Sequence, residues 1–572
     1  MYGFLSAYSE HQFDVLEEDK GSTPTTGETN GRSAWAIYYT QHKIMQGLLD
    51  IYKALKGTPD DATSQRALEI ASKMGDWIYL RLSRWTQADR ESMWNVYSAG
   101  EVGGIGQPLE ELYFITGDEL YRETATFFEH NNNWNRTGTS GRTTMGTGAN
   151  NGFEESAGTV TATTRSGDGF YAHFAQNGNG SWLNGKHANT IIPMVVSALR
   201  EYEADTPLDN TRINPVGYTP VATHYYDIAK NFFNHLYTVR MSPIGGFAHG
   251  ESFPSSNSPS WSTLLGSGSG SSNESCTTLN MMALAAGLFK HEQRAVYMDY
   301  YERALFNHIM PTLAQYDTST TRNGIDYLTY LGSNSTRSHG RYGDGSCCNS
   351  YGMESHTKYQ DQVFSKTKDA TGLYVNLYMP TTLNWVEKGF QIVQETDYLN
   401  GDGASKITVN GSGPLDIMLR VPYWIEKGYE VRVNGNVVIE NAARSSYVTI
   451  SRTWAYGDVI EISMPYSVRL ERSPENTTNT TVALWAAMDE LELAVLTVAP
   501  GQAPSFVIRK NMITQLKLDT NLENLTYTSS NPAIATVTQS GVVTGKSIGV
   551  AVIQIKEAIT GAIFNIVVNV TN

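Results

Sequence analysis

The sequence predicts a multidomain chain of three parts: a toroid of helices, an antiparallel β-sandwich and a small β domain. The length of 572 residues suggests two to four domains at roughly 150 residues each. Apolar residues recur at helical spacing up to about residue 370 and alternate with polar residues beyond it. The last segment has short strands and turn signals of its own. We therefore predict domains at residues 1–371, 372–494 and 495–572.

The composition indicates a protein with a large packed core. Hydrophobic residues make up 40% of the chain and charged residues 17%, against about 25% charged in an average protein. The 18 Phe, 33 Tyr and 11 Trp residues exclude global disorder. The net charge is −15, without a basic block, which gives the chain no electrostatic reason to bind nucleic acid or anionic membranes. No apolar run approaches the ~18 residues of a membrane span.

The first part carries the pattern of repeated helical hairpins. Residues 37–55 have apolar side chains three and four positions apart, and residues 64–82 form a second such segment. A loose repeat of Tyr, Ala and Phe close to one helical face recurs at Tyr121/Ala125/Phe128, Tyr225/Ala229/Phe232 and Tyr300/Ala304/Phe306. Recurring hairpins favour a toroid of helices over a parallel α/β sheet.

The remaining parts carry β patterns. From Gly372 onward, apolar and polar residues alternate between Asn-Gly and Gly turns, which predicts an antiparallel β-sandwich. The last part contains Ser529-Ser-Asn-Pro-Ala-Ile-Ala-Thr-Val and Gly541-Val-Val-Thr-Gly. These two motifs resemble the signature of the bacterial Ig-like domain of group 2.

The three cysteines leave several interpretations open. Cys347 and Cys348 are adjacent, and Cys276 lies two residues after Glu274. The cysteines could be buried structural thiols, or one of the pair could form a disulfide with Cys276. Alternatively, the three sulfurs and the carboxylate offer four metal ligands, the number that zinc prefers. Four protein ligands usually make a structural metal site.

Several segments of the first two parts, taken in order, resemble one known family. They are Gly3-Phe-Leu-Ser-Ala-Tyr-Ser-Glu, Tyr38-Tyr-Thr-Gln-His-Lys, Glu101-Val-Gly-Gly, Leu183-Asn-Gly-Lys-His, Gly245-Gly-Phe-Ala-His-Gly-Glu-Ser-Phe, Glu274-Ser-Cys-Thr-Thr and Cys347-Cys-Asn-Ser-Tyr. Up to about residue 480 the chain resembles the glycoside hydrolase family 127/146 group, formerly a domain of unknown function and typified by β-L-arabinofuranosidases. The resemblance implies an (α/α)6 barrel with an appended β-sandwich.

The resemblance also implies a site and a mechanism. It assigns four zinc ligands: Glu274, Cys276, Cys347 and Cys348. It makes Cys347 the nucleophile and Glu251 the general acid/base of a retaining glycosidase. Zinc would keep the cysteine ionised, so a closed set of four ligands is compatible with catalysis. Further residues implied to bind the sugar are His187, His249, His42, Glu101 and Tyr327.

The chain departs from the family at two places. The match begins almost at Met1, so we expect the barrel to lack its first helices and the true start to lie upstream. After the two glycines at 103–104, the chain has Gly106-Gln107-Pro108 where the family leads us to expect Asn-Glu. This difference bears on the activity and on the identity of the sugar.

The expected substrate is a plant-type oligosaccharide or polysaccharide that contains L-arabinofuranose. No signal peptide is visible, yet the Ig-like part favours a secreted, periplasmic or cell-surface location, with attachment through that part. Two alternatives stand beside this hypothesis. One is a non-catalytic surface protein that binds glycans or serves adhesion. The other is a hydrolase of the same scaffold for another plant-polysaccharide sugar.

Overall fold

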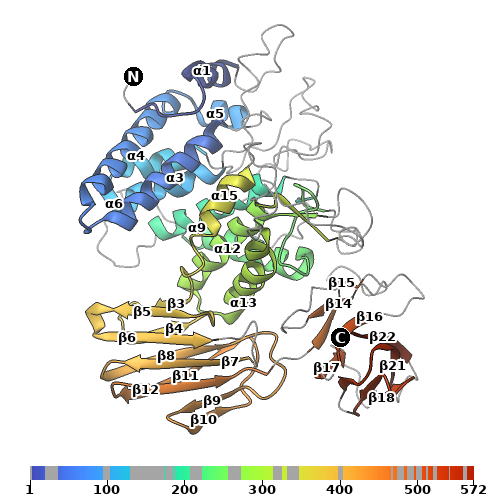
Figure 1. The fold of residues 1–572 in the computed structure, drawn as a ribbon. Coiled ribbons are helices and arrows are strands. Elements are labelled where there is room, and N and C mark those ends of the chain that lie inside the picture. Colours follow the sequence, from blue (N-terminus) through green and yellow to red (C-terminus); the bar gives the residue numbers. More distant parts are fainter. Residues whose placement is uncertain are drawn as a thin grey trace, which may run out of the picture. The chain divides into compact units, whose positions relative to one another are not determined.

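The computed structural model forms two compact units (Figure 1), which are described separately. The first comprises 1–241, 246–258 and 273–291, and the second 242–245, 259–272 and 292–572. The structure describes residues 3–19, 37–94, 103–128, 174, 183–184, 187–205, 222–254, 272–313, 325–331, 347–396, 403–465, 468–472, 482–485, 495–496, 505–510, 513–518, 525–539, 541–557 and 563–571.

The first unit is built from helical hairpins. Its helices are α1 (Glu10–Asp19), α3 (Ile37–Leu55), α4 (Asp61–Leu82), α5 (Gln87–Trp94), α6 (Gly106–Thr116), α7 (Glu119–Thr126), α9 (Ala188–Asp205), α10 (Ala222–His235) and α12 (Ser275–His291). In chain order, α3 contacts α6, α6 contacts α9 and α9 contacts α12, while α4, α7 and α10 each pair with the helix before them. This series of hairpins confirms the predicted helical fold class.

Aromatic side chains fill the core of this unit. Tyr38 of α3 makes edge contacts with Trp94 and Phe128, at ring-centroid distances of 5.3 Å in each case. Phe13 of α1 packs edge-on against the same tyrosine at 5.2 Å. Edge-on aromatic pairs add about 0.5–1.5 kcal/mol to the burial of their surface. The tyrosines that begin two copies of the Tyr/Ala/Phe repeat, Tyr121 and Tyr225, are both buried, so these positions belong to the hydrophobic core.

Gly104 is needed for close packing next to His42. It lies in the 3₁₀ turn Gly103–Ile105, and a Cβ there would come within 2.3 Å of the His42 ring. We expect Gly104→Ala to destabilise the helical unit by about 1–3 kcal/mol, as overpacking does. A matched control is Gly47→Ala on the exposed side of α3, where a Cβ would meet nothing within 4 Å.

The control substitution is expected to stabilise the protein by about 0.5–1 kcal/mol, because alanine has the higher helix propensity. Urea unfolding followed by helical circular dichroism measures both variants. A midpoint for Gly104→Ala at or above the wild-type value would contradict the close approach of His42.

The second unit begins with helical elements and continues into two facing sheets. The helical elements are α13 (Ala295–Ala304), the π-helical turn Leu305–Ile309, α14 (Met310–Thr312) and α15 (Cys347–Ser355), and β2 (Leu328–Tyr330) lies before α15. The sandwich strands are β3 (Phe364–Lys366), β4 (Gly372–Val375), β5 (Thr381–Trp385), β6 (Phe390–Thr396), β7 (Ala404–Asn410), β8 (Gly413–Val421), β9 (Glu430–Val433), β10 (Asn436–Glu440), β11 (Ser446–Trp454) and β12 (Asp458–Ser463).

These strands form a six-stranded sheet in the order β10-β9-β12-β7-β6-β5 and a four-stranded sheet in the order β11-β8-β4-β3. The pairing is antiparallel except between β4 and β8, which run parallel. The exception arises because the chain leaves the smaller sheet after β4, forms β5, β6 and β7 in the other sheet, and returns in the same direction. Side chains such as Ile392, Ile407, Ile417 and Ile460 fill the space between the sheets.

A buried ion cluster joins α13 to the sandwich within this unit. Arg420 of β8 is fully buried and reaches Asp299 and Glu302 of α13, each at 2.5 Å. Tyr300, between those two acids, donates a hydrogen bond from its hydroxyl to the carbonyl oxygen of Gly245 at 3.1 Å. A buried charge is tolerated when it is paired in this way. The sandwich therefore supports α13, and Tyr300 of α13 in turn contacts Gly245.

The C-terminal strands form two further sheets. They are β13 (Val468–Arg472), β14 (Val482–Trp485), β15 (Val495–Leu496), β16 (Ser505–Arg509), β17 (Ile513–Leu518), β18 (Leu525–Ser529), β19 (Ala535–Val537), β20 (Val542–Gly545), β21 (Gly549–Glu557) and β22 (Ile563–Thr571). One sheet has the order β15-β14-β13-β17-β20-β19 and the other β16-β22-β21-β18. Strands β13 and β14 precede the predicted boundary at 494/495, yet they pair with β17 and β15 in a C-terminal sheet. Strand β3 precedes the predicted boundary at 371/372, yet it pairs with β4 of the sandwich. Both boundaries stay predictions.

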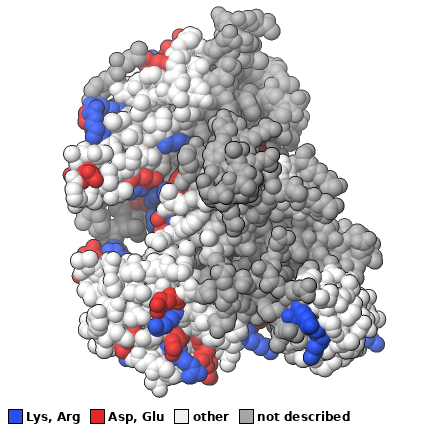
Figure 2. All heavy atoms as spheres, in the orientation of Figure 1, with Lys and Arg blue, Asp and Glu red and all other residues white. Residues whose placement is uncertain are grey.

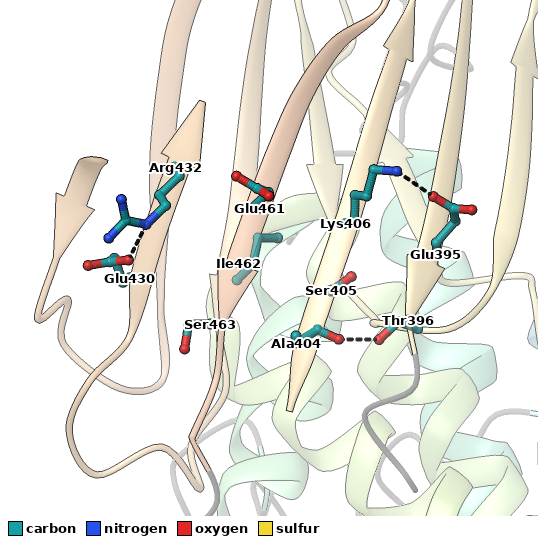
Figure 3. A pocket seen from close by; sticks show the side chains of 10 residues that line it. All are labelled: Glu395, Thr396, Ala404, Ser405, Lys406, Glu430, Arg432, Glu461, Ile462 and Ser463. Atoms are coloured by element: carbon teal, nitrogen blue, oxygen red, sulfur yellow. Dashed lines mark hydrogen bonds and ion pairs between the residues drawn. The ribbon is translucent and has the colours of Figure 1, made fainter. Parts of the chain in front are cut away.

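A shallow hollow of about 680 Å³ lies on the outer face of the six-stranded sheet (Figure 3). A row of alternating charges crosses β6, β7, β12 and β9 there, formed by the cross-strand neighbours Glu395, Lys406, Glu461 and Arg432. Lys406 pairs with Glu395 at 3.1 Å. Opposite charges at paired positions of neighbouring strands stabilise a sheet. Among the described residues that line this hollow, none is aromatic and none is a predicted site residue.

The described surface carries mixed charge. On the face drawn in Figure 2, Lys and Arg lie among Asp and Glu, and most of the described surface bears neither. Among the helices in the described ranges, none combines the length and the apolar character that crossing a bilayer requires.

Candidate active site

Four side chains that are far apart in the sequence meet in one cluster. Glu274, Cys276, Cys347 and Cys348 each offer one ligand atom, and these atoms all lie within 4.8 Å of one another. The three cysteines are free thiols, so the disulfide alternative is wrong. Three sulfurs and one carboxylate oxygen are a donor set that fits a metal ion of the zinc type. The cluster could therefore hold a metal ion, as the sequence predicts.

Secondary structure brings these ligands to helix N-termini. Glu274 is the last residue of β1 (Ser272–Glu274), and Cys276 lies in the first turn of α12. Cys347 and Cys348 are the first two residues of α15. The N-terminal end of a helix carries a partial positive charge, which favours an ionised thiolate at that position.

Exposure to solvent distinguishes one residue of the cluster from the other three. Glu274, Cys276 and Cys348 are fully buried, whereas Cys347 is partly exposed. Part of Cys347 is therefore in contact with solvent, whereas the other three residues of the cluster lie inside the protein. This is the position that the family resemblance makes the nucleophile.

Glu251 lies next to His187, in a tight turn between His249 and Ser252 within residues 245–254 (the Glu251 segment). The His187 Nε2 and Glu251 Oε2 atoms are 3.8 Å apart, and the Ala188 N–H donates to the Glu251 carbonyl oxygen at 2.9 Å. His187 and Ser252 form an antiparallel β-bridge. Gly250 adopts a φ of +62°, which favours glycine at this bend. The structure thus brings together two residues that the sequence predicted for the same site.

Burial sets the protonation of this pair. It lowers the pKa of His187 to about 4, so the imidazole is neutral at neutral pH. The Nδ1 atom of the ring lies 2.8 Å from the Thr190 hydroxyl. Burial raises the pKa of Glu251, because desolvation disfavours the carboxylate. Burial therefore shifts the pKa values of both side chains toward the neutral form.

Asn273 connects the Glu251 segment with Glu274 of the cluster. Gly250 and Asn273 form a parallel β-bridge, so Glu251 and Glu274 each follow a bridged residue. The Asn273 side chain donates to the Ala248 carbonyl oxygen at 2.5 Å. A Cβ at Gly246 would approach the Asn273 Cγ to 2.5 Å, so glycine is needed there. Sequence reasoning missed Asn273, although it directly precedes Glu274 in the same motif.

The other predicted sugar-binding residues occupy different settings. His249 is half-buried in the Glu251 segment, and burial lowers its pKa. His42 is buried beneath Gly104, and burial lowers its pKa well below the usual range. Tyr327 is half-buried directly before β2, and Glu101 lies outside the described residues. Their roles in sugar binding stay predictions.

The sequence matches three family profiles. Residues 1–361 match the catalytic domain of β-L-arabinofuranosidases of family GH127, and residues 372–466 match the GH127 middle domain. Residues 495–558 match the bacterial Ig-like domain of group 2. No curated protein sequence matches the chain.

Solved structures share the fold. One described as a glycoside hydrolase has a TM-score of 0.56 and 16% identity, covering 91% of this chain and 76% of its own. A GH127 β-arabinofuranosidase has a TM-score of 0.52 and 16% identity, covering 97% and 88%. Because the catalytic-domain profile spans more than half of the sequence, the chain belongs to the GH127 family of β-L-arabinofuranosidases and is a glycosidase.

Proposed function

We propose that this glycosidase is a retaining β-L-arabinofuranosidase with Cys347 as nucleophile and Glu251 as general acid/base. One observation carries the proposal: Cys347 is the partly exposed member of an otherwise buried Glu/Cys cluster. The raised pKa of Glu251, caused by burial, supports its role as the proton donor. The family match supports the sugar, because its profile is that of β-L-arabinofuranosidases.

We propose zinc as the metal, held by Glu274, Cys276, Cys347 and Cys348. When bound, zinc supplies positive charge that keeps the coordinated thiols ionised at neutral pH. The positions of the cysteines at the start of α12 and α15 favour the same ionised state.

The reaction proceeds in two displacements at the anomeric carbon. First, the Cys347 sulfur forms a bond to that carbon as the bond to the aglycone oxygen breaks, and Glu251 gives its proton to this oxygen. Then Glu251 takes a proton from water, whose oxygen bonds to the carbon as the carbon–sulfur bond breaks. The thiolate and the protonated carboxyl are restored, and the two inversions retain the configuration.

The side chains of His187 and His249 would bind sugar hydroxyls. His187 is neutral at neutral pH, so its ring can donate one hydrogen bond and accept another. Its Nε2 borders the Glu251 carboxylate at 3.8 Å, which supports a position beside the leaving group. We assign the same class of role to His249, His42, Glu101 and Tyr327.

We further propose that the enzyme acts outside the cytoplasm on plant-type polysaccharide. The match to a bacterial Ig-like domain at residues 495–558 supports this location. That domain would attach the enzyme to the cell surface or to its substrate.

A substrate panel with metal analysis tests the proposed function. We expect the purified full chain to hydrolyse an aryl β-L-arabinofuranoside, to release the β anomer first, and to contain about one zinc ion per chain. Aryl α-L-arabinofuranoside and aryl β-D-xylopyranoside serve as controls and are expected to stay intact. Preferential cleavage of either control, or release of the α anomer, would contradict the proposal.

A further inference from the structure

We infer that Arg240 is a positioning residue that holds Glu251 against the His187 segment, an inference that rests on the proposed role of Glu251. Arg240 is the last residue of the π-helical turn Leu236–Arg240 that follows α10, and it is 1% exposed. π-Helical turns are rare and occur frequently at functional sites. No motif of the sequence singles out this arginine.

The guanidinium group joins the two segments that carry His187 and Glu251. Its Nη2 donates to the Asn184 Oδ1 at 2.8 Å, and its Nη1 donates to the Pro254 carbonyl oxygen. Its Nε donates to the His235 Nε2 at 3.0 Å, which fixes the plane of the group relative to α10. Asn184 lies three residues before His187, and Pro254 lies three residues after Glu251.

These contacts extend a short antiparallel pairing. The Ala188 N–H bonds to the Glu251 carbonyl oxygen, and His187 bridges Ser252. Among the described residues, Asn184 and Pro254 follow in the same antiparallel order, and the guanidinium joins them. Because proline has no backbone N–H, the backbone of Pro254 can only accept a hydrogen bond, through its carbonyl oxygen. Arg240 thus continues a pairing that the backbone begins.

Packing around this contact keeps the Glu251 segment on α10. Phe253, between Ser252 and Pro254, is buried and makes an edge contact with Phe232 of α10 at 6.4 Å. The Glu251 segment is therefore held at its backbone, at Phe253 and at Pro254. The carboxyl group keeps its place beside the leaving-group oxygen because the chain on both sides of it is fixed.

Arginine suits this role better than lysine. Its planar group carries five N–H donors in a fixed fork, so it can serve three acceptors on different segments at once. A lysine ammonium has a single nitrogen and cannot reproduce that spread. A misplacement of about 1 Å at a reacting group can cost about 100-fold in rate.

The leaving group of the substrate reports the position of the proton donor. A dinitrophenolate leaves without a proton, whereas a methoxide leaves only with one. The value of kcat/KM reports the first displacement, in which Glu251 is the acid. A displaced Glu251 therefore slows the methyl glycoside much more than the dinitrophenyl glycoside, and a merely looser fold does not create this difference.

The test compares Arg240→Lys and Asn184→Ala with Glu251→Gln, in full-length protein at saturating zinc. We expect Arg240→Lys to lower kcat/KM for methyl β-L-arabinofuranoside by about 10- to 100-fold and for the dinitrophenyl glycoside by less than about threefold. Asn184→Ala removes one acceptor and leaves Arg240 in place, so it is expected to show the same pattern more weakly. Arg66→Lys, at an exposed side chain, is the matched control.

Equal losses on both substrates in Arg240→Lys, or no loss, would overturn the inference. If Arg240→Lys does not fold, the leaving-group ratio of Asn184→Ala decides in the same way. The result for Glu251→Gln distinguishes a failure of the proposed acid role of Glu251 from a failure of the positioning role of Arg240. If Glu251→Gln loses the same factor of kcat/KM on both glycosides, the proposed acid role of Glu251 is refuted. If Glu251→Gln slows the methyl glycoside more than the dinitrophenyl glycoside, but neither Arg240→Lys nor Asn184→Ala does so, only the positioning role is refuted.

Discussion

Replacement of Cys347 by serine is expected to lower kcat by about 10,000-fold or more, as removal of a nucleophile does in other hydrolases. The serine hydroxyl stays protonated at neutral pH, so it cannot attack the anomeric carbon as a thiolate does. Cys347 is the partly exposed member of the cluster, so its replacement leaves the packing of the buried ligands intact. Turnover of the aryl glycoside, melting temperature and metal content measure the outcome.

Cys348→Ser is the matched comparison for this variant. Cys348 is the next residue of α15 and is fully buried, so its loss disturbs the cluster from inside. We expect that variant to lose bound metal and to melt at a lower temperature, whereas Cys347→Ser keeps a melting temperature near the wild-type value. Turnover by Cys347→Ser at a tenth of the wild-type rate or more would refute the nucleophile assignment.

Replacement of Glu251 by glutamine is expected to lower kcat/KM for unactivated glycosides by about 100- to 10,000-fold. The general acid works in its protonated form, so activity falls as the pH rises through the pKa of Glu251 in the folded protein. Burial raises that pKa above its ordinary value, which moves the alkaline limb of the pH profile upward. A glutamine does not titrate, so this limb is expected to disappear from the profile of the variant.

The dinitrophenyl glycoside serves as the control for this variant, because its leaving group needs no proton. Its first displacement is expected to stay fast, while the second slows because no base activates water. The aryl alcohol is therefore released in a burst, followed by slow turnover. Persistence of the alkaline limb in Glu251→Gln would assign it to another group and remove Glu251 from the acid role.

The sequence predicted which residues form the cluster, but it did not predict that Cys347 alone is partly exposed. Glu274 and Cys276 are two residues apart, and Cys347 and Cys348 are adjacent, so each half is visible as a motif. That the halves meet within 4.8 Å depends on long-range folding. The partial exposure of Cys347 depends on the packing of distant residues, which no local pattern records.

The same limit explains the residues that sequence reasoning missed. Arg240 contacts Asn184 and Pro254, which lie 56 and 14 residues away along the chain. An arginine at the end of an amphipathic helix usually faces solvent, so its burial is not visible from the sequence. The sequence does not show which strands pair with each other. The alternation of apolar and polar residues predicts that residues 468–472 form a strand, but not that this strand pairs with β17.

The most direct test of the central claim, that the Cys347 sulfur bonds to the sugar, is a peptide map of trapped protein. Glu251→Gln is mixed with the dinitrophenyl glycoside, quenched in acid during the slow phase, digested and measured by mass spectrometry. We expect one pentosyl group on the peptide that contains Cys347, and none in the Cys347→Ser, Glu251→Gln double variant. A pentosyl group on an aspartate or glutamate peptide would contradict that claim.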